Sequence, residues 1–152
     1  MPEWTEADLT DLDRQALADA DACIERYVER MSRFEQRAAA EEAFQIGQIG
    51  NRYFDESAPF RSRKTDLHRC GVSIAVALQI VRRITVLMAP IVPFAMEKVW
   101  GWLGMEGDLH RGGWDEGMRD LPAGRALGKQ EILFPRIEDE VIQAEIGKLG
   151  KL

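Results

Sequence analysis

Apolar residues recur three or four positions apart through the middle of the sequence, from Leu67 to Met88, a spacing that marks one face of a helix. The first stripe consists of Leu67, Cys70, Ile74, Leu78, Val81, Ile84 and Met88. A second set widens it beyond what a surface helix needs: Val72, Val76, Ile80 and Leu87. Thr65 or Asp66 can start this helix. The pattern predicts the central, most enclosed helix of a bundle, with Val81 buried, although Arg82 and Arg83 interrupt its apolar character.

Prolines, glycines and periodicity divide the rest of the chain. We expect helices over residues 6–32, with Thr5 or Asp8 as cap, and over 34–54. Ala89-Pro90 ends the central helix, and Pro93 precedes a helix over 94–103 that Gly104 should cap. Residues 105–131 are rich in Gly, Asp and Arg and should form a loop region, followed by a short extended run over 132–134 and a helix over 138–149. The fold class is therefore all-α: one domain, residues 1–152, with about five helices and a Gly/Asp-rich loop region before the last.

The same periodicity assigns inward faces to the other helices. In the first helix they are Leu9, Leu12, Ala16, Ala20, Cys23, Tyr27 and Met31. In the second they are Ala40, Phe44, Gly47, Asn51 and Phe54, and in the last Val141, Ile142, Ile146 and Leu149. Gly47 and Gly50 each cost a helix about 1 kcal/mol against alanine, which favours close approach of a neighbouring backbone. Trp114 should pack the loop region onto the bundle, a ligand-stacking role being the alternative.

Composition excludes several classes of protein. The chain has 152 residues, 45% of them hydrophobic, which is enough for a sizeable core. No uninterrupted apolar run reaches the roughly 18 residues that a membrane span requires, and no signal peptide is evident, so we expect a soluble, cytoplasmic protein. Cys23 and Cys70 lie far apart, which argues against a zinc ribbon or a disulfide framework and favours reduced, buried thiols.

The sequence lacks the motifs of a self-sufficient enzyme. It contains no Gly-rich phosphate loop, no Gly-x-Ser-x-Gly and no His-Glu-x-x-His. Its two histidines, His68 and His110, have no partner nucleophile or metal-ligand set in the sequence, and a structural zinc site needs four ligands. We therefore assign no catalytic residue, no metal and no cofactor to this chain.

A proline-fixed aromatic residue next to cations is the strongest functional feature. In Asn51-Arg-Tyr-Phe-Asp-Glu-Ser-Ala-Pro-Phe60, Pro59 pushes Ala58 out of helical geometry, so the helix must stop and Phe60 stands at a corner. An exposed aromatic ring there would stack on single-stranded bases while nearby cations hold phosphate. The alternative is that Phe60 is a hydrophobic plug of the helix end.

Positive charge is concentrated after this corner. From Arg61 to Arg69 there are four cations, Arg61, Arg63, Lys64 and Arg69, against the single anion Asp66, a local charge of +3 in a chain of net charge −6. Because a general nucleic-acid binder is usually basic throughout, this distribution indicates a local contact. A solvated helix entrance would show the same charges.

Three segments resemble one family. The corner is similar to the Asn-Arg-Tyr-x-Asp-x-x-x-Pro-Trp segment in the anticodon-binding domain of methionyl-tRNA synthetases, which are class I aminoacyl-tRNA synthetases. Leu87-Met-Ala-Pro-Ile-Val-Pro-Phe94 with Glu97-Lys-Val-Trp100, and Leu133-Phe-Pro-Arg-Ile-Glu138, resemble two further segments in the same order, the last in its archaeal-type form. The resemblance covers about Leu12 to Lys148.

This resemblance implies a function and partners. The chain would be a fragment of a larger ligase, and its partners would be the anticodon stem-loop of methionine tRNA and the ligase's own catalytic domain, with neither DNA nor a membrane. The catalytic domain would use ATP with Mg²⁺, and its His-Ile-Gly-His-type and Lys-Met-Ser-Lys-Ser-type signatures are not in this sequence. The resemblance and the charge pattern together make Phe60, Arg61, Arg63, Lys64 and Arg52 the candidate tRNA-binding residues.

Two departures from the family pattern limit this assignment. Phe60 stands where the family usually has tryptophan, and the family's bundle begins one helix earlier, with an asparagine and an arginine that have no match near residues 1–13. Two alternatives remain open. One is a protein-binding helical module anchored by Phe60 and Trp114, and the other is the anticodon domain of a different class I synthetase.

Overall fold

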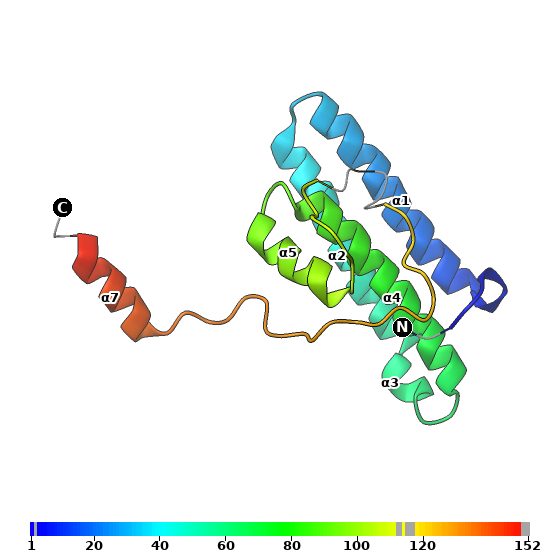
Figure 1. The fold of residues 1–152 in the computed structure, drawn as a ribbon. Coiled ribbons are helices and arrows are strands. Elements are labelled where there is room, and N and C mark those ends of the chain that lie inside the picture. Colours follow the sequence, from blue (N-terminus) through cyan, green and yellow to red (C-terminus); the bar gives the residue numbers. More distant parts are fainter. Residues whose placement is uncertain (2, 112–113, 115–117, 150–152) are drawn as a thin grey trace.

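The described residues of the computed structural model, which are 1, 3–111, 114 and 118–149, are helical and contain no strand. In chain order the elements are η1 (Glu6–Asp8), α1 (Asp11–Ser32), α2 (Gln36–Ser57), α3 (Pro59–Ser62), α4 (Leu67–Met88), α5 (Pro93–Trp102) and α7 (Asp139–Leu149). Figure 1 shows α1, α2, α4 and α5 side by side and α7 apart from them. The predicted all-α bundle is confirmed.

The first predicted helix is two elements. A short 3-10 turn, η1, ends at Asp8, and α1 begins only after Thr10. The Thr10 side chain accepts a hydrogen bond from the Asp13 amide, while the Asp13 carboxylate accepts one from the Thr10 amide. This reciprocal capping box satisfies amides that a helix start leaves without partners, so α1 starts there rather than at Thr5 or Asp8.

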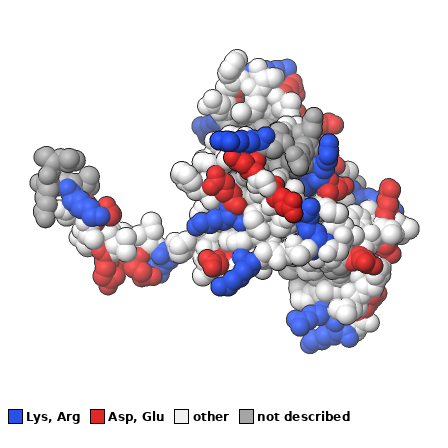
Figure 2. Space-filling view, in the orientation of Figure 1, with Lys and Arg blue, Asp and Glu red and all other residues white. Residues whose placement is uncertain are grey.

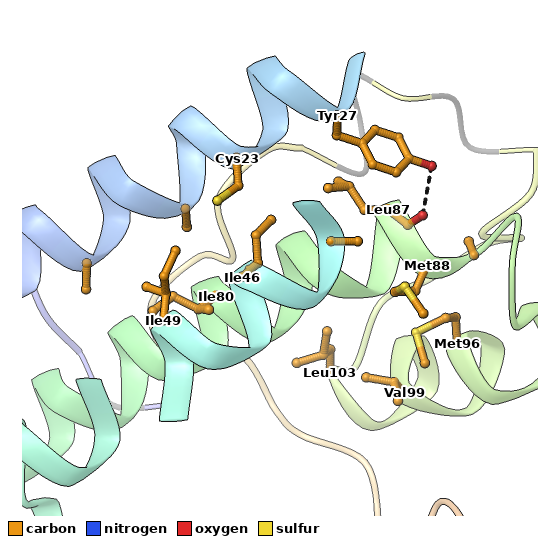
Figure 3. Packing of buried hydrophobic residues seen from close by; sticks show 14 of the residues in the cluster. Cys23, Tyr27, Ile46, Ile49, Ile80, Leu87, Met88, Met96, Val99 and Leu103 are labelled. Atoms are coloured by element: carbon orange, nitrogen blue, oxygen red, sulfur yellow. Dashed lines mark hydrogen bonds between the residues drawn. The ribbon is translucent and has the colours of Figure 1, made fainter. Parts of the chain in front are cut away.

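The core lies where α1, α2 and α4 meet, and it continues to α5 (Figure 3). On α1 the predicted inward residues Ala16, Ala20, Cys23 and Tyr27 are buried. On α2 the predicted stripe is wrong by about one position, because the buried residues are Ala39, Ala43, Ile46, Ile49 and Tyr53. Phe44 and Phe54 are instead 58% and 39% exposed. Small alanines let α2 approach its neighbours closely, so the buried face is set by fit and not by the largest side chains.

Gly47 and Gly50 let α2 pack close to α4, but the nearest atoms of α4 belong to side chains and not to its backbone. A Cβ on Gly47 would lie 3.3 Å from Ile84 Cδ1, and one on Gly50 would lie 3.2 Å from Ile80 Cγ2. Both glycines line a shallow apolar groove between the two helices, about 230 Å³ in volume, with Asn51 and Phe54 at its rim.

Helix α4 is the enclosed central helix that its sequence predicts, packed against α1, α2, α3 and α5. Two residues of its predicted stripe are nevertheless exposed, Leu67 at 75% and Val81 at 38%, whereas Val72, Val76, Ile80 and Leu87 are buried. It is also the one helix of the described chain long and apolar enough to cross a membrane, with 72% of that window buried inside the bundle. Its apolar character is therefore used for packing within the domain.

Helix α5 starts at Pro93, as predicted, and ends in a Schellman motif. The Gly104 amide donates to the Gly101 carbonyl and the Met105 amide to the Trp100 carbonyl, with Gly104 at φ +68°. Two of the contacts that hold the following loop to the bundle are made with α1 and α4. The Trp114 ring stacks on Tyr27 with centroids 6.1 Å apart, and the buried Gln79 amide pairs with both backbone groups of Leu121. Trp114 thus packs the loop, as predicted.

Helix α7 forms but does not join the core. An extended segment carries it away from the other helices (Figure 1). The predicted inward residues Val141, Ile142 and Ile146 are 54%, 42% and 53% exposed, so that prediction is wrong; the side chain of Leu149 lies outside the described part. An amphipathic pattern predicts that a helix has an apolar face, but not which surface covers it.

Candidate nucleic-acid interface

The corner that carries Phe60 is built by a strained residue and a proline. Helix α2 ends at Ser57, and Ala58 adopts left-handed geometry with φ 44° and ψ 56°. A non-glycine residue in this region costs about 1 kcal/mol or more, so surrounding contacts must hold it there. Pro59 is buried and begins the four-residue helix α3, which turns the chain back toward α4. The predicted stop before Pro59 is confirmed.

The ring of Phe60 lies outside the core. It is 55% exposed, and the Arg61 guanidinium carbon lies 5.8 Å from its centroid. That cation–π contact covers part of the ring and leaves the rest open to solvent. The plug alternative required an enclosed ring, and the structure does not have one at this position.

Three cations follow Phe60 in the chain. Arg61, Arg63 and Lys64 are all exposed, and among the described residues none of them forms a salt bridge. Figure 2 shows Lys and Arg gathered at the end of the molecule where α3 lies. Their charge is therefore available to an anionic ligand.

Arg69, the fourth cation of the predicted island, is used internally. Its Nη2 lies 2.8 Å from Asp13 Oδ1, and its side chain also contacts Ser73 and the Asp8 carbonyl. Asp66 is likewise engaged, because its carboxylate accepts the Arg69 amide at the start of α4. The solvent-facing island is thus smaller than the sequence indicates.

Arg52 does not join the corner. Its Nη2 lies 3.4 Å from Asp19 Oδ2 on α1, so the side chain is turned toward the α1–α2 face. There it lines a groove with Gln15, Ile49 and Glu56. The structure therefore brings together Phe60, Arg61, Arg63 and Lys64, and places Arg52 on a different face.

A buried network lies beneath the corner. Asp13 on α1 is fully buried and accepts hydrogen bonds from the Tyr53 hydroxyl at 2.6 Å and from Arg69 Nη2 at 2.8 Å. Burial by itself raises the pKa of Asp13, but the hydrogen bonds from Tyr53, Thr10 and Arg69 outweigh it and hold that pKa below its usual value. Burial, with the hydrogen bond to Asp13 second, raises the pKa of Tyr53.

His68 and Asp8 form a second polar pair. His68 Nε2 lies 3.0 Å from Asp8 Oδ1. Hydrogen bonds from the Thr5 side chain, and then from His68, lower the pKa of Asp8 to about 2. Sequence reasoning missed the Asp13 network, although two signals pointed to it: the Thr10-x-x-Asp13 capping box and the tyrosine of the Asn-Arg-Tyr segment.

Other chemistry is not evident in the described part of the chain. No group of three or more His, Cys, Asp or Glu side chains there could hold a metal ion. Cys23 and Cys70 are free and buried, as predicted. Arg82 is fully buried in α4 near Asp120, and burial lowers its pKa to about 10.

Comparison with known proteins agrees with this geometry. A family model described as the anticodon binding domain of methionyl tRNA ligase matches residues 2–149. The chain belongs to this family. A methionine–tRNA ligase of Parabacteroides distasonis is 41% identical over 145 residues, covering 93% of this chain and 21% of that protein. One from Pyrococcus horikoshii is 34% identical over 142 residues, covering 93% of this chain and 19% of that protein.

A solved structure shares the fold. The crystal structure of the apo form of Mycobacterium tuberculosis methionyl-tRNA synthetase superimposes with a TM-score of 0.81 at 25% identity, covering 90% of this chain and 28% of that one. The chain therefore spans about a fifth of the length of the curated relatives it matches. Its fold and family are those of an anticodon-binding domain.

Proposed function

We propose that this chain binds the anticodon stem-loop of methionine tRNA as part of a methionyl-tRNA synthetase, which charges that tRNA with methionine in an ATP-dependent reaction. Membership of the anticodon-binding family supports the substrate. The exposed ring of Phe60, with Arg61, Arg63 and Lys64 beside it, supports the place of contact. Arg52 is a secondary candidate, since it would have to leave Asp19 to reach phosphate.

The single observation that carries this proposal is the exposure of Phe60. An anticodon loop presents unstacked bases, and an aromatic face accepts a base of any sequence by stacking. The left-handed Ala58 and buried Pro59 set the direction of the ring. The exposed cations then hold the phosphates on either side, which attracts the loop without specifying its bases.

The test is Phe60→Ala in the full-length protein that carries this chain. Stacking contributes about 1–3 kcal/mol per base, so the affinity for an anticodon stem-loop should fall roughly tenfold or more, with little change in melting temperature. Phe60→Trp, which restores the usual family residue, should bind at least as tightly as the wild type. Fluorescence anisotropy with a labelled stem-loop and thermal unfolding give both numbers.

Phe34→Ala is the matched control. Phe34 is 87% exposed at the turn between α1 and α2, so it is also a solvent-exposed phenylalanine. The 22 residues of α2 separate it from the corner by about 33 Å. Its truncation should leave anticodon affinity unchanged. Equal effects of the two substitutions, or a large fall in melting temperature with Phe60→Ala alone, would contradict the proposal.

A second partner is the synthetase's own catalytic domain. Exposed apolar side chains follow the C-terminal segment from Ile132 through Phe134 and Ile137 to α7, and the bundle does not cover them. A surface of this kind favours contact with another protein domain. In this proposal ATP and Mg²⁺ belong to that domain, and the whole enzyme is cytoplasmic. ATP–pyrophosphate exchange by this chain alone would contradict that division.

A helical module that binds another protein is the competing function. It would use apolar contacts such as those of α7, and its affinity would change little with salt. Binding through phosphate falls steeply between about 50 and 200 mM salt. Stem-loop binding that falls steeply with salt would therefore support RNA recognition, whereas no stem-loop binding and a protein interaction insensitive to salt would support the competing function.

A further inference from the structure

The RNA-contacting corner is attached to the bundle by two helix ends. One is the C-terminal end of α2 at Ser57, and the other is the N-terminal end of α4 at Leu67. Residues 58–66 between them carry Phe60 and its cations. Because Ala58 is in an unfavourable region of backbone geometry, this segment needs outside contacts to keep one arrangement.

One carboxylate oxygen of Asp13 is hydrogen-bonded to both helix ends. Asp13 Oδ1 accepts a hydrogen bond from the hydroxyl of Tyr53 on α2 at 2.6 Å, and another from Nη2 of Arg69 on α4 at 2.8 Å. The second oxygen, Oδ2, accepts the amide and the hydroxyl of Thr10 at 2.7 and 2.8 Å. Asp13 is fully buried and its carboxylate accepts all four of these hydrogen bonds, so the two helix ends are held at one spacing.

The partners of this carboxylate are themselves held. Tyr53 is 1% exposed. The guanidinium of Arg69 also donates to the Ser73 hydroxyl and to the Asp8 carbonyl. The backbone amide of Arg69 donates to the Asp66 carboxylate. Hydrogen bonds to a buried charge are shorter and stronger than those between neutral groups, so the network resists rearrangement.

We propose that Asp13, Tyr53 and Arg69 are positioning residues for RNA recognition. They order residues 58–66 before the RNA arrives, so that binding does not have to order that segment. This inference rests on the proposed function, because it assigns the Asp13 network to the same corner. None of the three side chains touches the ligand, and they act through the position of Phe60.

The bundle contains a matched structural control. Tyr27 is also a buried tyrosine of the core, 3% exposed, and its hydroxyl donates to the Leu87 carbonyl at 3.0 Å (Figure 3). It lies about 21 Å farther along α1 than Asp13, at the other end of the helix. Tyr27→Phe and Tyr53→Phe each remove one buried hydroxyl. The first lies near the C-terminal end of α1, and the second contacts Asp13 near its N-terminal end.

The experiment compares these two variants in the full-length protein. Amide hydrogen exchange of residues 58–66 is measured without RNA, and anisotropy gives the affinity for an anticodon stem-loop of methionine tRNA. Both variants should lower the melting temperature by similar amounts. Only Tyr53→Phe should speed exchange in the corner, and only it should weaken binding, by roughly three- to tenfold, the range for one buried hydrogen bond.

A double substitution tests whether Tyr53 acts through Phe60. If it does, Tyr53→Phe should have almost no further effect on affinity once Phe60 is alanine. The inference is overturned if Tyr53→Phe and Tyr27→Phe have the same effect on exchange and affinity, or if corner exchange and affinity do not change together. If Phe60→Ala alone leaves binding intact, the proposed function fails instead, while the exchange data still report whether the network orders the corner.

Discussion

At the scale of single residues, buried polar side chains determine more of this structure than its apolar pattern suggests. Gln79 lies on the central helix α4, yet its side chain forms two 2.8 Å hydrogen bonds with the backbone of Leu121 and so attaches the loop to α4. Arg83 reaches Asp21 on α1 at 2.6 Å. These groups are tolerated in the interior because each has a partner of matching chemistry.

Asp13 allows a prediction of pH dependence. Its folded-state pKa is lowered, so the folded protein binds fewer protons than the unfolded chain, whose aspartate pKa is about 3.9. The stability contributed by Asp13 is therefore present above that pH and is lost as pH falls through the lower folded value. Asp13→Asn should cost more stability at pH 7 than at pH 3 in urea unfolding. An equal loss at both pH values would show that the carboxylate charge is unimportant.

At the scale of elements, α4 is a helix whose position was predicted correctly but whose buried face was predicted wrongly. Its length and a start at Thr65 or Asp66 follow from the sequence, and the structure has Asp66 as the cap, but the stripe through Val81 is not the most buried face. Both apolar sets satisfy helical spacing, so periodicity alone cannot choose between them. Packing against α1 and α2 buries Ile80 and leaves Val81 at the rim of the groove.

Neighbouring residues on α4 should therefore differ sharply. Ile80 is 2% exposed and Val81 is 38% exposed. Ile80→Asp places an unpaired carboxylate in the core, at a cost of several kcal/mol, and should unfold a domain of ordinary stability. Val81→Asp can orient its charge toward solvent and should lower the melting temperature only slightly. Circular dichroism melts that ranked the two variants in the opposite order would contradict the rotation of α4 seen in the structure.

At the scale of the whole molecule, charge is distributed unevenly. The chain carries a net charge of −6, yet the end formed by α3 presents Arg61, Arg63 and Lys64 without acidic partners among the described residues. An acidic body repels RNA elsewhere, so the basic end restricts where a stem-loop can approach.

This distribution predicts a specific salt response. Arg63→Ala and Lys64→Ala should each weaken binding of any similar stem-loop about equally, whatever its anticodon. Each should also reduce the slope of log affinity against log salt by about 0.7 to 0.9. Arg37→Ala is the control, because Arg37 is exposed on α2 but paired with Glu41. A change in anticodon preference with Arg63→Ala would mean that this side chain reads a base edge.

The sequence by itself determined the long helices, the break at Ala89-Pro90 and the corner at Pro59, because helical spacing, capping residues and the geometry of proline act over a few neighbouring positions. It did not predict the break between η1 and α1 or the short helix α3. Only the tertiary structure decided the rotation of α2 and α4, the internal use of Arg69, and the separation of α7 from the bundle. Each of these depends on which distant surface a side chain meets, since both faces of a helix can satisfy the local pattern. Asp13 shows the difference clearly: its capping role can be predicted from Thr10, three residues away, whereas its contacts with Tyr53 and Arg69 exist only after three helices have packed together.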